Sequence, residues 1–361
     1  MIWHISDLLQ KFLCRSGSKP DTFSKFIFRR VTNPPYDYYC KSSISEIKGL
    51  HLFEILFLGT SASAPSAKRG LSAQIVKHDE YRFLIDCGEG TQRQILQSGA
   101  GFKHLNRILL THGHLDHILG LAGLLSTFMR WEAIDQLEIW GGKGTLERVR
   151  TLLYDVVLRG IQPPMPLHLR EINPGVFMEG DDFTVSAFPV THRGPDCFGF
   201  LFESKARRPF LDGKATELGV PFGPERRDLV EGKSITLPDG RIIASDDVLG
   251  GLQKGVKFVV VGDTGKTEDL LEVCREADAL VIESTYLDAE ADMAREFSHN
   301  TAKHAAELAR DAGVKKLILT HISRRYREKD VLAEAQAIFP NTAVARDFDS
   351  FQIKRDTNPE A

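Results

Sequence analysis

The hydrophobic positions of this chain fall into short runs that alternate with segments of helical character. Apolar or alternating runs closed by glycine or polar residues are typical of strands; they lie at 53–59, 71–88 (two successive strands), 107–111, 183–190, 197–203, 256–262, 279–285 and 315–320. Helices are predicted at 91–99, 116–130, 144–158, 266–277 and 299–312. The first of these helices ends at Gly99, a residue type favoured at helix C-termini.

Two segments interrupt this alternation of predicted strands and helices. Residues 204–252 are polar and rich in turns, with little apolar periodicity, so we expect them to project as an inserted arm. Residues 1–50 are rich in basic, serine and aromatic residues around NPPYDYY (33–39), and we interpret them as an N-terminal extension. The remaining chain, 51–361, is predicted to form one α+β domain that carries the arm.

Composition indicates the cellular environment of the protein better than its function. The formal net charge is −3 over 361 residues, so any contact with nucleic acid must come from a local basic patch. The five cysteines are scattered and form no CxxC pair, which favours a reducing, cytoplasmic location over a disulfide framework. No apolar run approaches the roughly 20 residues that span a membrane, so we expect a soluble protein without a membrane partner.

The strongest chemical signal is THGHLDH at 111–117, which holds three of the 12 histidines. Side chains two apart on an extended segment point the same way, so His112 and His114 should converge on one point. Asp116 and His117 follow the bend where the next helix begins and should aim at a second point. We interpret the two pairs as ligands of two neighbouring metal ions.

Three further candidate ligands each follow the end of an apolar strand: His192 in FPVTH, Asp263 in VVVGDTG and His321 in LILTH. Imidazole nitrogens and carboxylate oxygens without a thiolate predict Zn²⁺, with Mn²⁺ or Fe²⁺ as alternatives. Asp263 is the natural bridge, because its two oxygens can serve both ions. Two metals about 3.5–4 Å apart lower the pKa of a shared water, which predicts hydrolytic chemistry.

These motifs resemble the metallo-β-lactamase superfamily, and residues 53–352 further resemble its ribonuclease Z branch, the endonucleases that process tRNA 3′ ends. The similar stretches are FLGTSASAPS (57–66), LIDCGEGTQRQI (84–95), GDTG (262–265), IEST (282–285), HNTAKHAAELA (299–309) and LTHISRRY (319–326). The resemblance implies a four-layer αββα sandwich with a projecting arm. It also implies removal of the 3′ trailer from precursor tRNA by a homodimer with two Zn²⁺ per subunit.

The resemblance also implies roles for single residues. It assigns one metal to His112, His114, His192 and Asp263, and the other to Asp116, His117, Asp263 and His321. Asp116 would accept the proton of the attacking water, and His299 would give a proton to the leaving 3′ oxygen. Glu283 would hold the other ring nitrogen of His299. From the residues alone, His299 could instead be a helix-start or surface residue, and Glu283 a strand end facing water.

For RNA binding, LGVPFGPERRDLVEG (218–232) resembles the Gly-Pro motif of the family's arm. The resulting substrate-binding candidates are Gly223, Pro224, Arg226 and Arg227, together with Arg325 of the HxSxRY motif. Phenylalanines scattered at strand positions indicate core and not a surface for stacking RNA bases.

Three stretches depart from the family's pattern. Residues 229–232 lack the lysine that follows Gly-Pro, residues 68–70 read KRG where Arg-Asn is usual, and His299-Asn300-Thr301 stands for HST. None of these departures changes a predicted metal ligand.

The sequence also allows other functions. VGDTGKT (261–267) imitates a phosphate-binding loop, but position 260 is valine where the earlier glycine is required. A metallo-β-lactamase-fold phosphodiesterase acting on small diesters is the main alternative. A non-catalytic RNA-binding module with a vestigial metal site is the second.

Overall fold

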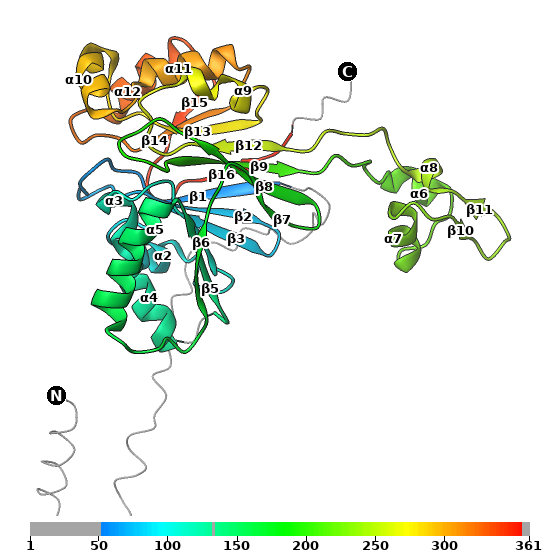
Figure 1. Cartoon of the computed structure of the whole chain (residues 1–361). Coiled ribbons are helices and arrows are strands. Elements are labelled where there is room, and N and C mark those ends of the chain that lie inside the picture. The colour runs from blue at the N-terminus through cyan, green and yellow to red at the C-terminus, as the bar shows by residue number, and fades with distance from the viewer. Residues whose placement is uncertain (1–51, 132–133, 356–361) are drawn as a thin grey trace, which may run out of the picture. The chain divides into compact units, whose positions relative to one another are not determined.

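The computed structural model describes residues 52–131 and 134–355, and the predicted N-terminal extension lies outside these residues (Figure 1). Alternating side chains on the strands explain how its layers form. On β1 (Phe53–Gly59), Phe53 and Phe57 pack into the cluster between the two sheets, while Leu56 and Leu58 pack outwards under helices. Both faces of the central strands are therefore buried, which is why their sequences read as almost continuous apolar runs.

Two mixed sheets of seven strands form the inner layers. The first sheet has the spatial order β16 (Ser350–Ile353), β1, β2 (Ala73–His78), β3 (Tyr81–Ile85), β4 (Arg107–Leu109), β5 (Leu137–Gly141) and β6 (Leu167–Glu171). The second has the order β15 (Thr342–Val344), β14 (Leu317–Thr320), β13 (Ala279–Glu283), β12 (Lys257–Val260), β9 (Phe198–Ser204), β8 (Phe183–Pro189) and β7 (Gly175–Glu179).

Helices cover the outer face of each sheet (Figure 1). The first sheet is covered by α2 (Thr91–Ser98), α4 (Gly120–Trp131), α5 (Lys143–Arg150) and the π-helical η2 (Thr151–Leu158). The second carries η3 (Glu268–Leu270), α9 (Leu271–Cys274), η4 (Asp288–Glu290), α10 (Ala291–Phe297), α11 (Ala302–Asp311) and α12 (Glu328–Gln336). The predicted αββα sandwich is thereby confirmed.

Two predicted helices were too long. The segment predicted at 266–277 holds only the short η3 and α9. The helix predicted from 299 begins at Ala302, because Thr301 is extended and its hydroxyl accepts the backbone N–H of His304 as an N-cap. Residues 299–301 therefore stay outside the helix, and His299 is presented from a loop.

The connection between β9 and β12 forms the arm, which stands apart from the sheets in Figure 1. It contains α6 (Asp212–Glu217), α7 (Pro224–Val230), the ribbon β10 (Ile235–Thr236) and β11 (Ile242–Ile243), and α8 (Ser245–Val248). The low apolar periodicity of this segment does not leave it without a core. Its sparse apolar residues form a core of their own around Leu229, Val248 and Ala215, all fully buried.

Strand direction brings the candidate residues to one edge. In the second sheet β12, β13 and β14 are parallel, and β8 runs the same way because both β8 and β12 are antiparallel to β9. In the first sheet β3 and β4 are parallel. Polar residues that follow these strands can therefore meet at the carboxyl ends. Within 52–131 and 134–355, no helix is long and apolar enough to cross a membrane.

Candidate metal centre

The first group of donors comes from the loop after β4 and from the loops after β8 and β12. His114 Nδ1 lies 2.9 Å from His112 Nε2 and 3.2 Å from His192 Nε2. Asp263 Oδ2 lies 3.7 Å from His112 Nε2 and 3.8 Å from His192 Nε2. Nitrogen donors around a tetrahedral zinc ion are separated by about 3.3 Å. The spacing of these four side chains therefore suits one ion.

The second group comes from α3 (Leu115–Ile118) and from the residue after β14. Asp116 Oδ2 lies 3.7 Å from His117 Nε2 and 3.6 Å from His321 Nε2. Asp263 lies between the groups: its Oδ2 is 3.5 Å from His117 Nε2 and its Oδ1 is 3.4 Å from His321 Nε2. The predicted ligands thus converge as two adjacent sets that share Asp263.

Threonine hydroxyls fix the orientation of two imidazoles. Thr111 Oγ1 donates to Asp86 at 2.8 Å, so its oxygen must accept the N–H of His112 Nδ1 at 3.0 Å. Thr285 likewise donates to Glu283 and accepts from His321 Nδ1 at 2.9 Å. In both histidines the proton is on Nδ1, which leaves the lone pair of Nε2 directed at the cluster.

The remaining ring orientations come from other partners. His192 Nδ1 donates to the carbonyl of Ser298 at 2.7 Å, and His117 Nδ1 donates to Asp86 Oδ2 at 2.7 Å. His114 presents Nδ1, not Nε2, to the cluster. Each predicted histidine ligand therefore directs one nitrogen to a common volume.

Sequence reasoning missed Asp86, although this residue lies in the family-like stretch LIDCGEGTQRQI (84–95). The carboxylate is fully buried and holds both Thr111 and His117, so it connects the two ligand groups. Its backbone φ is 57°, and that of His321 is 55°, a left-handed conformation that costs about 1–3 kcal/mol for a non-glycine residue. Asp86 could have been found from its position directly after the apolar strand β3, because the same kind of position identified Asp263 and His321.

Unpaired polar atoms and charge test whether cations fit this site. Among described residues, His117 Nε2, His321 Nε2 and Asp263 Oδ1 are buried atoms without a hydrogen-bond partner, and such orphans are rare in folded proteins. Three carboxylates, Asp86, Asp116 and Asp263, are brought together here. Divalent cations would accept the lone pairs of these unpartnered atoms and would neutralise the charge of the carboxylates. The residues therefore fit a pair of metal ions.

The pKa directions agree with this charge balance. Burial lowers the pKa of His112, His114 and His192, which keeps these rings neutral and able to bind a metal. Burial also opposes a charge on His117, but Asp263 and Asp86 outweigh it and raise the pKa of His117 well above its usual value. A positive charge is therefore favoured where the second set of ligands meets.

His299 lies beside this cluster and outside its two main ligand sets. Its Nδ1 is 3.0 Å from Glu283 Oε1 and 3.9 Å from Asp263 Oδ2. Glu283 is fully buried at the end of β13, so it is not the water-facing residue that the sequence alone allowed. Burial lowers the pKa of His299, but the charge and hydrogen bond of Glu283 outweigh it and raise the pKa to about 9.

Comparisons with known proteins identify the family of this chain. The beta-lactamase superfamily domain matches residues 81–213 and 236–322. Ribonuclease Z of Bradyrhizobium diazoefficiens is 48% identical over 302 residues, which cover 84% of this chain and 100% of the relative. The chain belongs to the ribonuclease Z family. Ribonuclease Z of Archaeoglobus fulgidus is 39% identical over 310 residues, covering 84% of this chain and 99% of the relative.

Solved structures support the same family. The crystal structure of human tRNase Z, short form, superposes with a TM-score of 0.58 at 26% identity, covering 84% of this chain and 100% of that one. A metallo-beta-lactamase fold protein from Bacillus subtilis has a TM-score of 0.59 at 16% identity, covering 83% and 99%, and so shares the fold.

The substrate-binding candidates of this ribonuclease Z family member have different surroundings. Arg227 is exposed and pairs with Glu231 at 2.9 Å, and Arg325 is half-exposed and pairs with Glu290 at 3.1 Å. The Arg226 side chain is only 12% exposed, because its guanidinium bonds to Asp212 and to arm carbonyls. Gly223 and Pro224 begin α7, with Pro224 in the first turn, where its missing N–H is tolerated.

Three phenylalanines of the described residues, Phe222, Phe297 and Phe348, are exposed and lie outside the core. Phe222 in the Gly-Pro motif is 83% exposed, and the Arg226 guanidinium stacks on its ring at 3.6 Å. Phe222 lies outside the strand positions for which a core role was predicted.

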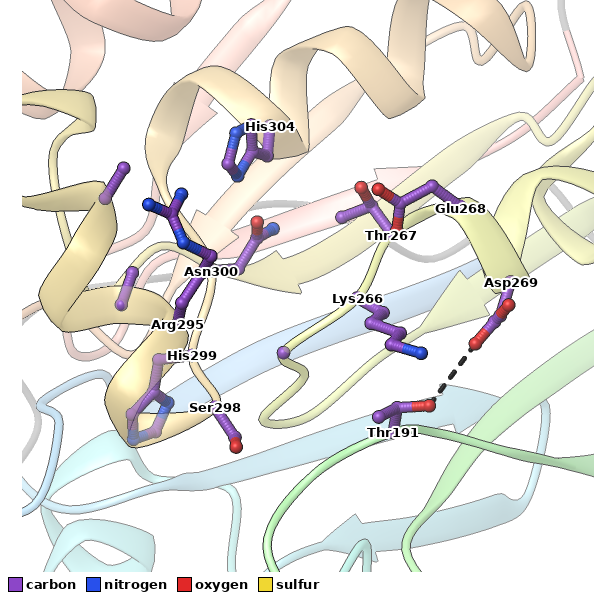
Figure 2. Close-up of a pocket in the computed structure, with 13 residues that line it drawn as sticks. Thr191, Lys266, Thr267, Glu268, Asp269, Arg295, Ser298, His299, Asn300 and His304 are labelled. Carbon is purple, nitrogen blue, oxygen red and sulfur yellow. Dashed lines mark hydrogen bonds between the residues drawn. The ribbon is translucent and has the colours of Figure 1, made fainter.

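A cavity of about 750 Å³ adjoins the metal centre at His299. One wall is the segment from α10 to α11, and the other is the loop that follows Asp263 (Figure 2). Figure 2 shows Arg295, His299 and His304 on the first wall, and Thr267, Glu268 and Asp269 on the second. Sequence reasoning found only His299 among these residues.

Proposed function

We propose that this protein is a metal-dependent endoribonuclease that cleaves precursor tRNA at its 3′ side and releases the trailer. The observation that carries the proposal is the convergence of imidazole and carboxylate donors from separate loops beside a histidine held by Glu283. Relatives named ribonuclease Z that this chain matches over their full length support the same activity.

We further propose two divalent cations per subunit, Zn²⁺ before Mn²⁺ or Fe²⁺. His112, His114 and His192 would hold one, Asp116, His117 and His321 the other, and Asp263 both. When bound, such a pair supplies a Lewis acid for the phosphate and lowers the pKa of water towards neutrality.

Protein groups would move the protons of the reaction. Asp116 Oδ2 accepts the proton that the attacking water loses, and its backbone partner, the N–H of Ser63 at 3.0 Å, holds it in place. His299 Nε2 donates a proton to the 3′ oxygen as the P–O bond breaks, because Glu283 keeps the ring protonated and occupies Nδ1. The products are a 3′ hydroxyl on the tRNA body and a 5′ phosphate on the trailer.

The arm would hold the tRNA body away from the cut. Exposed Arg227 on α7 is suited to a phosphate contact, which binds RNA without reading its sequence. Arg226 instead stabilises the conformation of the Gly-Pro loop, because its guanidinium already pairs with Asp212 and stacks on Phe222 within the arm. Arg325 would contact RNA nearer the cluster, since it lies four residues after His321.

We infer a homodimer by analogy with the family, with each arm presenting RNA to the partner's site. Leu115 and Leu119, four residues apart on one helical face, are 57% and 39% exposed next to Asp116. Exposed apolar residues of this kind are suited to an interface between subunits. A cytoplasmic location follows from the same proposal and from the free thiols of Cys87, Cys197 and Cys274.

The test is incubation of the purified full-length protein with a precursor tRNA that carries a 3′ trailer, followed by end mapping. We expect one cut that leaves a 3′ hydroxyl on the body, abolished by a chelator and restored by Zn²⁺ or Mn²⁺. A protein that turns over bis(p-nitrophenyl) phosphate but leaves the precursor intact would instead be a small-diester phosphodiesterase.

A further inference from the structure

The cavity beside His299 has features of a binding site that the reaction scheme leaves unused. Its volume of about 750 Å³ falls within the range of pockets that enclose small organic ligands. Lys266 lines it and, among described residues, its amine has no carboxylate within ion-pair distance. Asn300 lines it too and is 3% exposed, and its Nδ2 has no hydrogen-bond partner in the described chain.

We propose that this cavity is a subsite for the unpaired nucleotides at the 3′ end of the tRNA body. The proposal rests on the proposed function, because the direction of the chain comes from His299. If His299 protonates the leaving 3′ oxygen, the nucleotide that carries this oxygen must lie against His299. The cavity begins at this residue, so it is the space into which that nucleotide and its neighbour extend.

Cationic and polar groups from both walls of the cavity are suited to the phosphate of a nucleotide. Lys266, Arg295 and His304 offer donors for a backbone phosphate. Asn300 Nδ2 supplies one more donor in the wall for a sugar or base oxygen. Of the lysine and arginine that line the cavity, Arg295 pairs with Asp292, whereas Lys266 has no ion-pair partner among described residues, and a bound phosphate would neutralise its charge.

The loop that follows Asp263, which carries Lys266, would also recognise the base. Glu268 is exposed, and Asp269 accepts a hydrogen bond from Thr191 at 3.3 Å, so both side chains offer acceptor oxygens at the cavity. Carboxylates accept from the exocyclic amino group of cytosine, whereas uracil places an acceptor oxygen at the same point. The subsite should therefore favour cytosine over uracil at the nucleotides it receives.

The experiment compares two precursor tRNAs that differ only by cytosine or uracil at the last unpaired nucleotide of the body. We expect the wild-type protein to show a kcat/KM about fivefold or more higher for cytosine, the scale of one base-specific hydrogen bond. Glu268→Ala should bring this ratio close to one. Glu272→Ala, which removes an exposed acid on α9 outside the cavity, is the matched control and should keep the ratio.

The phosphate contact is tested by the salt dependence of precursor binding. Lys266→Ala should weaken binding and reduce the slope of log Kd against log salt by about 0.7, the loss of one phosphate contact to a single strand. Lys303→Ala removes a neighbouring lysine that pairs with Asp288 outside the cavity, and should leave the slope unchanged. Metal content per chain shows whether each variant keeps its centre.

Two results would overturn the subsite without touching the proposed function. One is a wild-type protein that cuts the cytosine and uracil precursors equally well. The other is a Lys266→Ala variant with the wild-type salt slope. If the wild-type protein cuts neither precursor, the proposed function itself fails.

Discussion

The metal centre and the arm are built in opposite ways from the same chain. In the centre, ligands from distant segments are placed by rigid strands, and buried partners such as Asp86 fix their orientation. The arm has only short helices and a two-stranded ribbon, packed on a core of a few residues around Leu229. The centre can hold charges at fixed distances, whereas the arm can supply a surface for a large substrate but little rigidity.

This difference suggests different consequences for mutations in the two regions. A change in the centre should act on metal binding or the chemical step, with RNA binding largely kept. A change in the arm should act on RNA binding, with the chemistry of small substrates kept.

The largest effect is expected for Asp263→Ala. The variant removes the one carboxylate shared by both ligand groups, so metal content and precursor cleavage should be lost together. Elemental analysis of freshly purified protein, with a cleavage assay on the same sample, measures both. A variant with full metal content would contradict the bridging role.

His299→Ala should separate chemistry from metal binding. Removal of a general acid typically lowers turnover by about 10²–10⁴-fold, while metal content should stay at the wild-type level because His299 is a proton donor in this account. Equal loss of metal in His299→Ala and Asp263→Ala would show that His299 is a ligand.

Glu283→Gln should show the role of Glu283 in the pH profile. The carboxylate raises the pKa of His299, so its loss lowers that pKa, and activity should fall off at a lower pH on the alkaline side than in the wild type. An alkaline limb at the wild-type position would mean that Glu283 does not act through His299.

Asp86→Asn should weaken the metals without removing any ligand. Loss of a buried partner of a metal-binding histidine typically costs about 10–100-fold in metal affinity, so activity should be recovered at raised Zn²⁺. Titration of the chelator-treated variant measures the affinity. An unchanged affinity would mean that Asp86 serves only the fold of the β3–β4 edge.

The smallest effect on chemistry is expected for Leu229→Ala in the arm. Truncation of a buried leucine costs about 2–5 kcal/mol of packing, enough to loosen a core of this size. KM for precursor tRNA should rise, while turnover of bis(p-nitrophenyl) phosphate stays at the wild-type rate. Val230→Ala, which changes an exposed neighbour, is the control. Loss of small-diester turnover in Leu229→Ala would contradict the independence of the two regions.

The same contrast explains what the sequence could predict. The metal ligands were predictable because their residue types are rare and their places at strand ends are set by backbone geometry, as for His112 and Asp263. Asp86 and Thr285 were not, since an aspartate or threonine after a strand has many ordinary uses. The arm's core was missed because its apolar residues come singly in elements too short to show a period, such as α8.

The cavity was also beyond prediction from the sequence. Its walls come from α10 and from the loop after Asp263, segments with no sequence pattern that links Lys266 to Arg295 or His304. The helix predicted from 299 would have placed His299 in regular structure. The N-cap at Thr301 instead leaves it on a loop, where it contacts both Glu283 and the cavity.

Anomalous X-ray diffraction from crystals of the zinc-loaded protein tests the central claim most directly. The account predicts two peaks per chain, one ligated by His112, His114 and His192, the other by Asp116, His117 and His321, with Asp263 on both. A single peak, or a second ion bound without Asp263 or His321, would contradict it.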